Sequence, residues 1–259
     1  MNWALRRQIL YVIIFILVIG AFGFLLVYPH FNKAPTCFDQ KQDGNETGID
    51  CGGSCQLACA DQVDKVAVLW ARAFEVVPGR YNAVAYLENK NNGAAVEKIT
   101  YRFRFGDKDN VYIGKREGTT FIPPAGRFAV FEPAIDVGNS VPMYTTFEFT
   151  EDPVWIQIPP QKAAELQTSV SNISLSGEDT APRLSASLMN NSLLAIPNIN
   201  VIAILYGADG NAVSASKTYI GRLDAGQSAA INFTWPEPFT QKVVAKEILP
   251  VYNIFDVHL

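Results

Sequence analysis

The chain has 259 residues and a formal net charge of −4, with 21 Lys and Arg against 25 Asp and Glu. This balance provides no basic field for a nucleic acid, so that class of partner is excluded. Charged residues make up only 18% of the chain, and the part beyond the N-terminal 30 residues or so is rich in β-forming and turn residues. Its length suits two domains of about 100 residues each.

Residues 9–28 form an uncharged apolar run, ILYVIIFILVIGAFGFLLVY. As a helix rising about 1.5 Å per residue, the run is about 30 Å long and matches the hydrocarbon thickness of a bilayer. Arg6 and Arg7 precede the run, and the positive-inside rule keeps them cytoplasmic. We therefore expect a single-pass signal-anchor in the cell membrane, with residues 1–8 as a cytoplasmic tail and everything after Tyr28 extracytoplasmic.

The alternative to this anchor is a cleaved signal peptide. Such a peptide has an apolar region of about 7–15 residues and a small-x-small cleavage site. The run in this chain is longer, and the bulky residues Tyr28-Pro29-His30-Phe31 follow it. These features favour a retained anchor.

All four cysteines lie in a predicted stalk, residues 29–60. An even, clustered set in an exported segment predicts two disulfides, and three pairings are open. A zinc site would need closely spaced cysteine pairs, and the spacings here do not fit one. The disulfide residues are Cys37, Cys51, Cys55 and Cys59.

The segment from Cys37 to Cys59, with its Asp50-Cys-Gly-Gly-Ser-Cys55 core, resembles a cysteine motif that recurs in bacterial surface proteins. The resemblance implies an extracellular setting. The segment also carries oxygen ligands that partly copy a calcium loop, but Ser54 stands where a bidentate Glu belongs. A solvated, disulfide-held loop is the favoured interpretation, and a calcium site the alternative. Its ligands would be Asp39, Asp43, Asn45 and Asp50.

The remainder contains an internal repeat with an offset near 100 residues. Residues 80–89 align with 183–190, residues 96–105 with 196–205, and the turn 124–126 with 224–226. Their constant order predicts two domains of the same fold. We place the first at residues 61–160 and the second at residues 161–259.

Alternating residues in both halves predict β-strands. Tyr101, Phe103 and Phe105 alternate with arginines, so the aromatic rings should face a core and the arginines water. Leu184, Ala186 and Leu188 alternate with serines in the same way. Asp109-Asn110 and Asp209-Gly210 predict hairpin turns, and Pro159-Pro160 a boundary loop. Frequent turns between short strands predict β-sandwiches, so the fold class is mainly β with one transmembrane helix.

The segment Ile202-Ala-Ile-Leu-Tyr-Gly-Ala-Asp-Gly210, followed by Asp224-Ala-Gly226, resembles the FxLYD-type Ig-like domains of prokaryotic envelope proteins. Gly207 stands where that pattern has Asp, and Ala225 where it has Pro. The resemblance implies tandem seven-stranded Ig-like sandwiches and a non-enzymatic role, without catalytic residues to transfer.

No catalytic motif is recognisable, so no catalytic residue, metal or cofactor is assigned. The two histidines, His30 and His258, do not fit a triad. Trp70, Trp155 and Trp235 could stack on sugars, but aromatic residues of a sandwich are more often part of its core.

The sequence therefore favours a non-enzymatic structural or interaction protein of the cell envelope. A surface module that binds a glycan or a peptide is the alternative, and an extracellular hydrolase is less favoured. The partners are the lipid bilayer, through residues 9–28, and an unknown protein or glycan. An exposed Trp and Tyr patch would favour a glycan, a long unpaired edge strand would favour strand addition, and a deep polar pocket would favour an enzyme.

Overall fold

A computed structural model of the protein describes residues 3–31 and 36–257. The chain divides into two compact units, Met1–Cys55 and Gln56–Leu259. The first contains a long helix and a small cysteine-rich segment. The second is built from antiparallel β-sheets, so the predicted fold class is confirmed.

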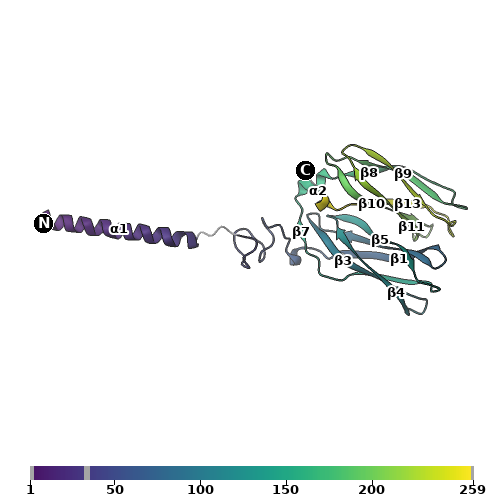
Figure 1. The fold of residues 1–259 in the computed structure, drawn as a ribbon, viewed down its shortest axis with the longest axis horizontal. Coiled ribbons are helices and arrows are strands. Elements are labelled where there is room, and N and C mark those ends of the chain that lie inside the picture. The colour runs from purple at the N-terminus through teal and green to yellow at the C-terminus, as the bar shows by residue number, and fades with distance from the viewer. Residues whose placement is uncertain (1–2, 32–35, 258–259) are drawn as a thin grey trace. The chain divides into compact units, whose positions relative to one another are not determined.

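The first unit begins with helix α1, Trp3–Phe31 (Figure 1). Within it, the 21 residues Arg6–Leu26 are long and apolar enough to cross a membrane, and none of their side chains is buried. The helix is apolar on all sides, so it has no polar face to turn toward water. The predicted apolar helix is therefore present. A signal sequence and a membrane anchor share this length and composition.

The cysteine-rich segment after α1 is a series of turns held by disulfides. Cys37 is bonded to Cys55, with an S–S distance of 1.99 Å and a Cα–Cα distance of 5.6 Å. Cys51 and Cys59 are disulfide-bonded as well. The predicted disulfides are thus present, and the pairing left open by the sequence includes Cys37–Cys55.

The second unit begins with a single 3-10 turn, η1 (Ala60–Gln62), and continues into a first sandwich. One sheet has the strand order β1-β2-β5, and the other has the order β4-β3-β6 with β7 paired to the start of β3. The strands are β1 (Ala67–Val77), β2 (Arg80–Asn89), β3 (Ala94–Gly106), β4 (Tyr112–Ile122), β5 (Gly126–Asp136), β6 (Tyr144–Phe149) and β7 (Ile156–Gln157).

The second sandwich repeats this arrangement. Its sheets have the orders β12-β9-β8 and β11-β10-β13, so each strand from β8 to β13 corresponds to one from β1 to β6. The strands are β8 (Thr168–Ser176), β9 (Arg183–Asn190), β10 (Ile196–Tyr206), β11 (Ala212–Leu223), β12 (Ser228–Thr234) and β13 (Ala245–Val251), followed by the 3-10 turn η2 (Ile254–Asp256).

A short helix, α2 (Pro160–Glu165), connects the two sandwiches. The prediction of a loop at Pro159-Pro160 was wrong for the second proline. Proline lacks an N–H, and its fixed φ suits the first helical position, so Pro160 begins a helical turn instead of continuing the loop.

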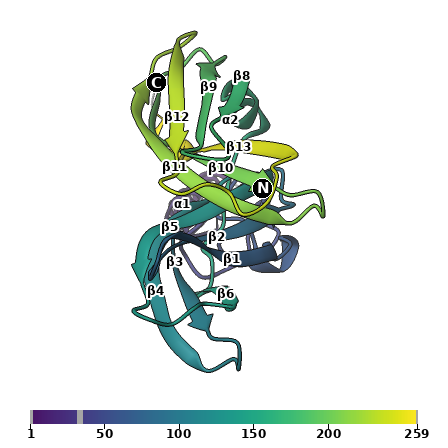
Figure 2. The same cartoon turned by 90° about the vertical axis from the view of Figure 1, so that its right-hand side faces the viewer.

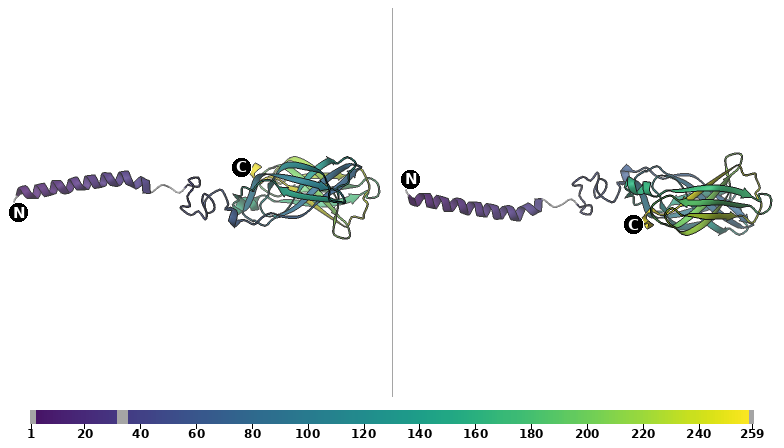
Figure 3. Two further views of the ribbon diagram at one scale, coloured as in Figure 1. Left: turned by 90° about the horizontal axis from the view of Figure 1, so that it is seen from below. Right: turned by 90° about the horizontal axis from the view of Figure 1, so that it is seen from above.

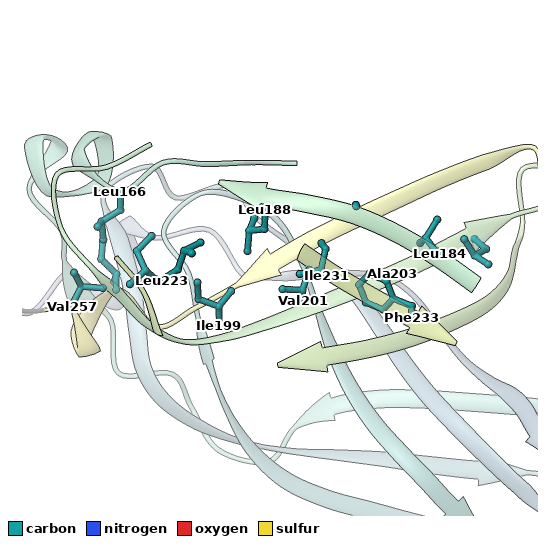
Figure 4. Packing of buried hydrophobic residues seen from close by; sticks show 14 of the residues in the cluster. Leu166, Leu184, Leu188, Ile199, Val201, Ala203, Leu223, Ile231, Phe233 and Val257 are labelled. Carbon is teal, nitrogen blue, oxygen red and sulfur yellow. The ribbon is translucent and has the colours of Figure 1, made fainter. Parts of the chain in front are cut away.

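Each sandwich has its own apolar core. Tyr101, Phe103 and Phe105 are buried in the first core, so the predicted alternation in β3 is confirmed. Leu184, Ala186 and Leu188 are buried in the second core. Figure 4 shows Leu184 and Leu188 in this core with Phe233 of the neighbouring strand β12 and Val201 of β10, in the facing sheet.

A third apolar layer lies between the sandwiches. Sheet β1-β2-β5 packs against sheet β11-β10-β13 through Val84 and Phe131 on one side and Ile202 and Ile204 on the other. Figure 2 shows these two sheets facing each other, and in Figure 3 the strands of both sandwiches run along the length of this unit. We call this the shared layer. The two sandwiches therefore form one stack of four sheets.

Polar contacts surround the shared layer. The hydroxyls of Tyr86 and Tyr206 donate to the two carboxylate oxygens of Glu247, at 2.6 and 2.7 Å. Arg72 of β1 donates to the side chain of Asn211, at 2.8 Å. Burial and the Glu247 hydrogen bonds raise the pKa of Tyr86 to about 12. The bonds from Tyr86 to Glu247 and from Arg72 to Asn211 cross from one sandwich to the other, whereas Tyr206 bonds to Glu247 within the second sandwich. The crossing bonds fix the two sandwiches relative to each other.

Candidate functional site

The outer face of sheet β4-β3-β6 is exposed and chemically varied, and we call it the open face. It points away from the first core because Phe103 and Phe105 of β3 turn inward. Arg102 and Arg104 therefore point outward, as the alternation predicted. The neighbouring strands add Lys115 and Glu117 from β4 and Thr146 and Glu148 from β6, opposite these arginines.

Two tyrosines lie at one end of the open face. Tyr112 of β4 and Tyr144 of β6 are both in register with Gly106 of β3, one on each side. Their side chains are 60% and 52% exposed. Because directly paired residues of antiparallel strands share one face, both rings lie on the same side of the sheet.

A side-chain amide lies against Gly106, the residue that the two tyrosines flank. A Cβ added to Gly106 would lie 3.1 Å from Oδ1 of Asn110, so this side chain covers the glycine. Asn110 itself is exposed and adopts a left-handed conformation, φ 58°, in the β3–β4 turn. The turn predicted at Asp109-Asn110 therefore forms and places an amide, which can donate and accept, beside the glycine that pairs with both tyrosines.

A network of ion pairs follows the tyrosines along the sheet. Arg102 Nε lies 2.6 Å from Glu117 Oε1, which also contacts Lys115 Nζ at 3.1 Å. Glu148 Oε1 contacts Arg102 Nη1 at 3.3 Å and Arg104 Nη2 at 3.2 Å. The hydrogen bond from Arg102 to Glu117 lowers the pKa of the Glu117 carboxyl and raises the pKa of the Arg102 guanidinium. Each carboxylate is thereby held between two cations.

Exposed apolar side chains extend the tyrosine end. They come from the β3–β4 turn and from the segment that leads into β6, which is tied to Gly106 by a hydrogen bond from the Met143 amide at 2.9 Å. These residues are Val111, Val141 and Met143, all more than half exposed.

The outer face of the second sandwich has a different character. On sheet β12-β9-β8, Ser185 lies between Asn232 and Ser174 of the neighbouring strands, and Ser187 lies between Ala230 and Ser171. These positions carry no charge and no aromatic ring. The open face of the first sandwich is therefore the stronger candidate for recognition.

A buried carboxylate lies on the inner side of β4. Glu132 is 8% exposed, accepts a hydrogen bond from the Tyr101 hydroxyl at 2.5 Å, and lies 3.1 Å from Arg116 Nε. Burial and Glu132 together raise the pKa of Tyr101. Gly118 leaves room for this group, since a Cβ there would lie 2.5 Å from the Tyr101 hydroxyl. The ion pair between Arg116 of β4 and Glu132 of β5 therefore links the two sheets of the first sandwich.

A groove of about 200 Å³ lies at the seam between the sandwiches. Pro123 and Pro124 line one side, Tyr252 lines the other, and Arg127 is the charged residue in the lining. The Tyr252 hydroxyl is directed to the carbonyl of Leu166, at 3.1 Å. This groove has one charged group and lacks convergent acid and base residues.

Asp39, Asn45 and Asp50 of the candidate calcium ligands accept hydrogen bonds inside their own segment. Asp50 accepts from the backbone amides of Asp39 and Gln40, and Asn45 accepts from the Ser54 hydroxyl at 2.7 Å. One oxygen of Asp43 is buried without a hydrogen-bond partner among the described residues. Calcium binding stays a prediction.

One group of potential metal ligands is found among the described residues, and it consists of Cys37, Glu46 and Cys55. Both sulfurs are in the Cys37–Cys55 disulfide. A disulfide sulfur lacks the thiolate charge that metals require, so this group offers a single carboxylate.

The tryptophans are part of the packing. Trp155 and Trp235 are 5% and 6% exposed, so the prediction that they belong to the cores is confirmed. Trp70 is half-buried and stacks on Tyr86 beside the shared layer, with ring centroids 5.4 Å apart. Of the two histidines, His30 lies in α1 and His258 lies outside the described residues.

Sequence reasoning missed Tyr112 and Tyr144. They are far apart in the chain, and only the register of three strands brings them to the two sides of Gly106. The sequence did contain one signal. Arg102 and Arg104, on the strand between the two that carry the tyrosines, alternate with apolar residues and so marked this sheet face as exposed.

Comparison with known proteins identifies no family. No family model and no curated protein match the chain. Solved structures with similar sheets include red sea bream transglutaminase (11% identity, 74% of this chain and 31% of that chain, TM-score 0.24). Others are a putative β-galactosidase from Bacteroides fragilis (10%, 68% and 33%, TM-score 0.22) and a Bacteroides uniformis β-glucuronidase (12%, 69% and 27%, TM-score 0.21).

The chain spans a third or less of each of these proteins. The likeness is a distant one between β-sandwich sheets and carries no argument about function. Ig-like β-sandwich sheets are present in the chain, whereas membership of the FxLYD-type family stays a prediction.

Proposed function

We propose that the chain is a single-pass membrane protein whose retained helix α1 holds the two-sandwich unit outside the cytoplasm. The observation that carries this proposal is the presence, in one chain, of an apolar helix of bilayer length and of disulfides. Disulfides persist in oxidising compartments, and Arg6 and Arg7 favour a cytoplasmic N-terminus.

We further propose a structural and interaction role in the cell envelope, without catalysis. The shared layer and the hydrogen bond from Tyr86 to Glu247 join the two sandwiches, so the unit presents its surfaces in a fixed geometry. A rigid scaffold lowers the entropy lost on binding. The open face, with exposed rings beside ordered charges, is the surface best suited to a partner.

A glycan-binding role is the second candidate. It is supported by the two exposed tyrosines on one sheet face, with the Asn110 amide against the glycine that pairs with both. This arrangement offers two aromatic rings and a hydrogen-bonding group on the same face of one sheet.

Cell fractionation tests the topology. We expect the full-length protein to sediment with membranes, to resist alkaline extraction and to keep residues 1–28 when its intact mass is measured. Protease added to spheroplasts should degrade the region after Phe31. As a control, Leu17→Arg and Val18→Arg together place two charges at the centre of the span, which costs about 5 kcal/mol and should weaken membrane association. A soluble exported protein that has lost its N-terminal residues would show that α1 is a signal peptide and would overturn the proposal.

A further inference from the structure

We propose that the open face binds a neutral, β-1,4-linked glycan, with Tyr112 and Tyr144 as stacking platforms. The inference rests on the proposed function in one respect, because envelope glycans reach this face only if the two-sandwich unit is exported. Binding of a purified oligosaccharide tests the face independently of the topology.

The spacing of the two strands that carry the tyrosines favours an extended chain. Tyr112 and Tyr144 are on the two strands that flank β3, so their backbones are about 10 Å apart, twice the spacing between strands. This is close to the length of one disaccharide unit. A β-1,4 linkage joins equatorial positions and keeps the sugar rings in a flat ribbon, whose apolar C–H faces can lie on aromatic rings. An α-1,4-linked chain coils and cannot place successive rings on a flat sheet in this way.

The polar groups suit hydroxyl recognition. The Asn110 amide lies against Gly106, which pairs with both tyrosines, and can both donate and accept. Thr146, next to Arg104 on the sheet, adds an exposed hydroxyl. A sugar bound across the tyrosines would therefore meet donors and acceptors at its edges and apolar surface on its face.

The charge pattern favours a neutral glycan over an acidic one. The network contains three cations and two carboxylates, Glu117 and Glu148, and each carboxylate already contacts two of the cations. A single formal positive charge remains on the face. A uronate would have to displace an existing ion pair, whereas a neutral hydroxyl can bond to Arg104 or Glu148 without breaking the network.

The experiment is a calorimetric titration of the full-length protein in detergent micelles. The probes are cellohexaose and chitohexaose, both β-1,4-linked, with α-linked maltohexaose and hexagalacturonate as comparisons. We expect saturable binding of at least one β-1,4-linked neutral probe. Its affinity should change little between roughly 50 and roughly 500 mM salt. Maltohexaose and hexagalacturonate should bind at least about tenfold more weakly.

Matched variants assign the binding to the open face. Tyr112→Ala and Tyr144→Ala should each weaken binding about tenfold, because each loses a stacking ring, whereas Tyr112→Phe should keep it. Tyr219→Ala is the control, since Tyr219 is a 58% exposed tyrosine of the second sandwich. Its removal should leave affinity unchanged, and circular dichroism should show that every variant is folded.

Three results would overturn the inference. They are a lack of binding to both β-1,4-linked probes, equal affinity of wild type and both alanine variants, and tighter, salt-sensitive binding of hexagalacturonate. A protein partner that requires Val111 and Met143, in the absence of glycan binding, would instead assign the exposed apolar end to protein recognition. None of these outcomes alters the fractionation test, so failure of the glycan inference is separable from failure of the proposed topology.

Discussion

Asn89 and Asn190 occupy the same position in the two sandwiches and make the same set of hydrogen bonds. Each ends the second strand of its sandwich and is fully buried. Asn89 donates to the carbonyls of Ala94 and Pro123, at 3.0 and 2.8 Å. Asn190 donates to those of Leu194 and Leu223, at 2.8 and 3.0 Å. Each side-chain oxygen also accepts from the amide two residues further on, that of Asn91 or of Ser192. One amide thus joins a tight turn to a corner of the facing sheet in each sandwich.

Replacing either asparagine by alanine should destabilise the protein by about 3 kcal/mol, because two buried carbonyls lose their donor. Urea denaturation followed by tryptophan fluorescence measures the change. Asn92→Ala is the control, since Asn92 is exposed in the turn beside Asn89. If Asn190→Ala were as stable as Asn92→Ala, the corner amide would have no structural role.

Gly118 and Gly114 of β4 should respond differently to alanine. A Cβ at Gly118 would lie 2.5 Å from the Tyr101 hydroxyl and 2.9 Å from Glu132, whereas one at Gly114 meets nothing within 4 Å. We expect Gly118→Ala to lower the free energy of unfolding by about 2 kcal/mol through overpacking, and Gly114→Ala to leave it unchanged or slightly raised. Thermal melts of both variants check this, and equal melting temperatures would contradict it.

The shared layer predicts cooperative unfolding of the two sandwiches. Ile204 is fully buried between them, so Ile204→Ala should cost about 3 kcal/mol. Differential scanning calorimetry of the wild type should show one transition for the two sandwiches, and Ile204→Ala should shift the whole of it. Two well-separated transitions in the wild type would show that the sandwiches unfold independently.

Stability should decline at high pH because of the tyrosines bonded to Glu247. The pKa of Tyr86 is raised from 10.0 to about 12 in the folded state, so the folded protein keeps a proton that the unfolded chain has lost. The stabilisation is complete below pH 10 and is lost as the pH rises toward about 12. Melting temperatures measured from pH 9 to 12 should fall, and the fall should be shallower in Tyr86→Phe. An unchanged slope in that variant would assign the effect to other groups.

The strand pattern could be predicted from the sequence because it depends on local alternation. Tyr101, Phe103 and Phe105 face a core and Arg102 and Arg104 face outward, as period-two alternation requires. The pairing of Cys37 with Cys55 could not be predicted, because four cysteines permit three connectivities and the choice depends on how the turns bring them together.

The shared layer was not predicted, although the sequence contains its signal. Val84 and Tyr86 lie between the inward-facing Ala83, Ala85 and Leu87, so this run is apolar on both faces. A continuous apolar run is typical of a strand buried on both sides. The tyrosine pair of the open face has no such local signal, since it depends on the register of three strands.

The repeat alignment shows how the two sandwiches differ at the positions that form the shared layer. Arg102 and Arg104 align with Ile202 and Ile204, so corresponding outward positions are cationic in one sandwich and apolar in the other. The first sandwich is joined through its sheet β1-β2-β5. The second is joined through β11-β10-β13, which corresponds to the other sheet of the first sandwich, β4-β3-β6.

Head-to-tail stacking of this kind does not by itself limit the number of modules, because each module has a second outer sheet on which a further module could pack. Here the arginines at one extremity and the serines at the other act as caps, comparable to the polar terminal repeats of solenoids. The two outer faces therefore lack the apolar residues that form the shared layer, and a longer array would require a middle module with apolar residues at both sets of positions.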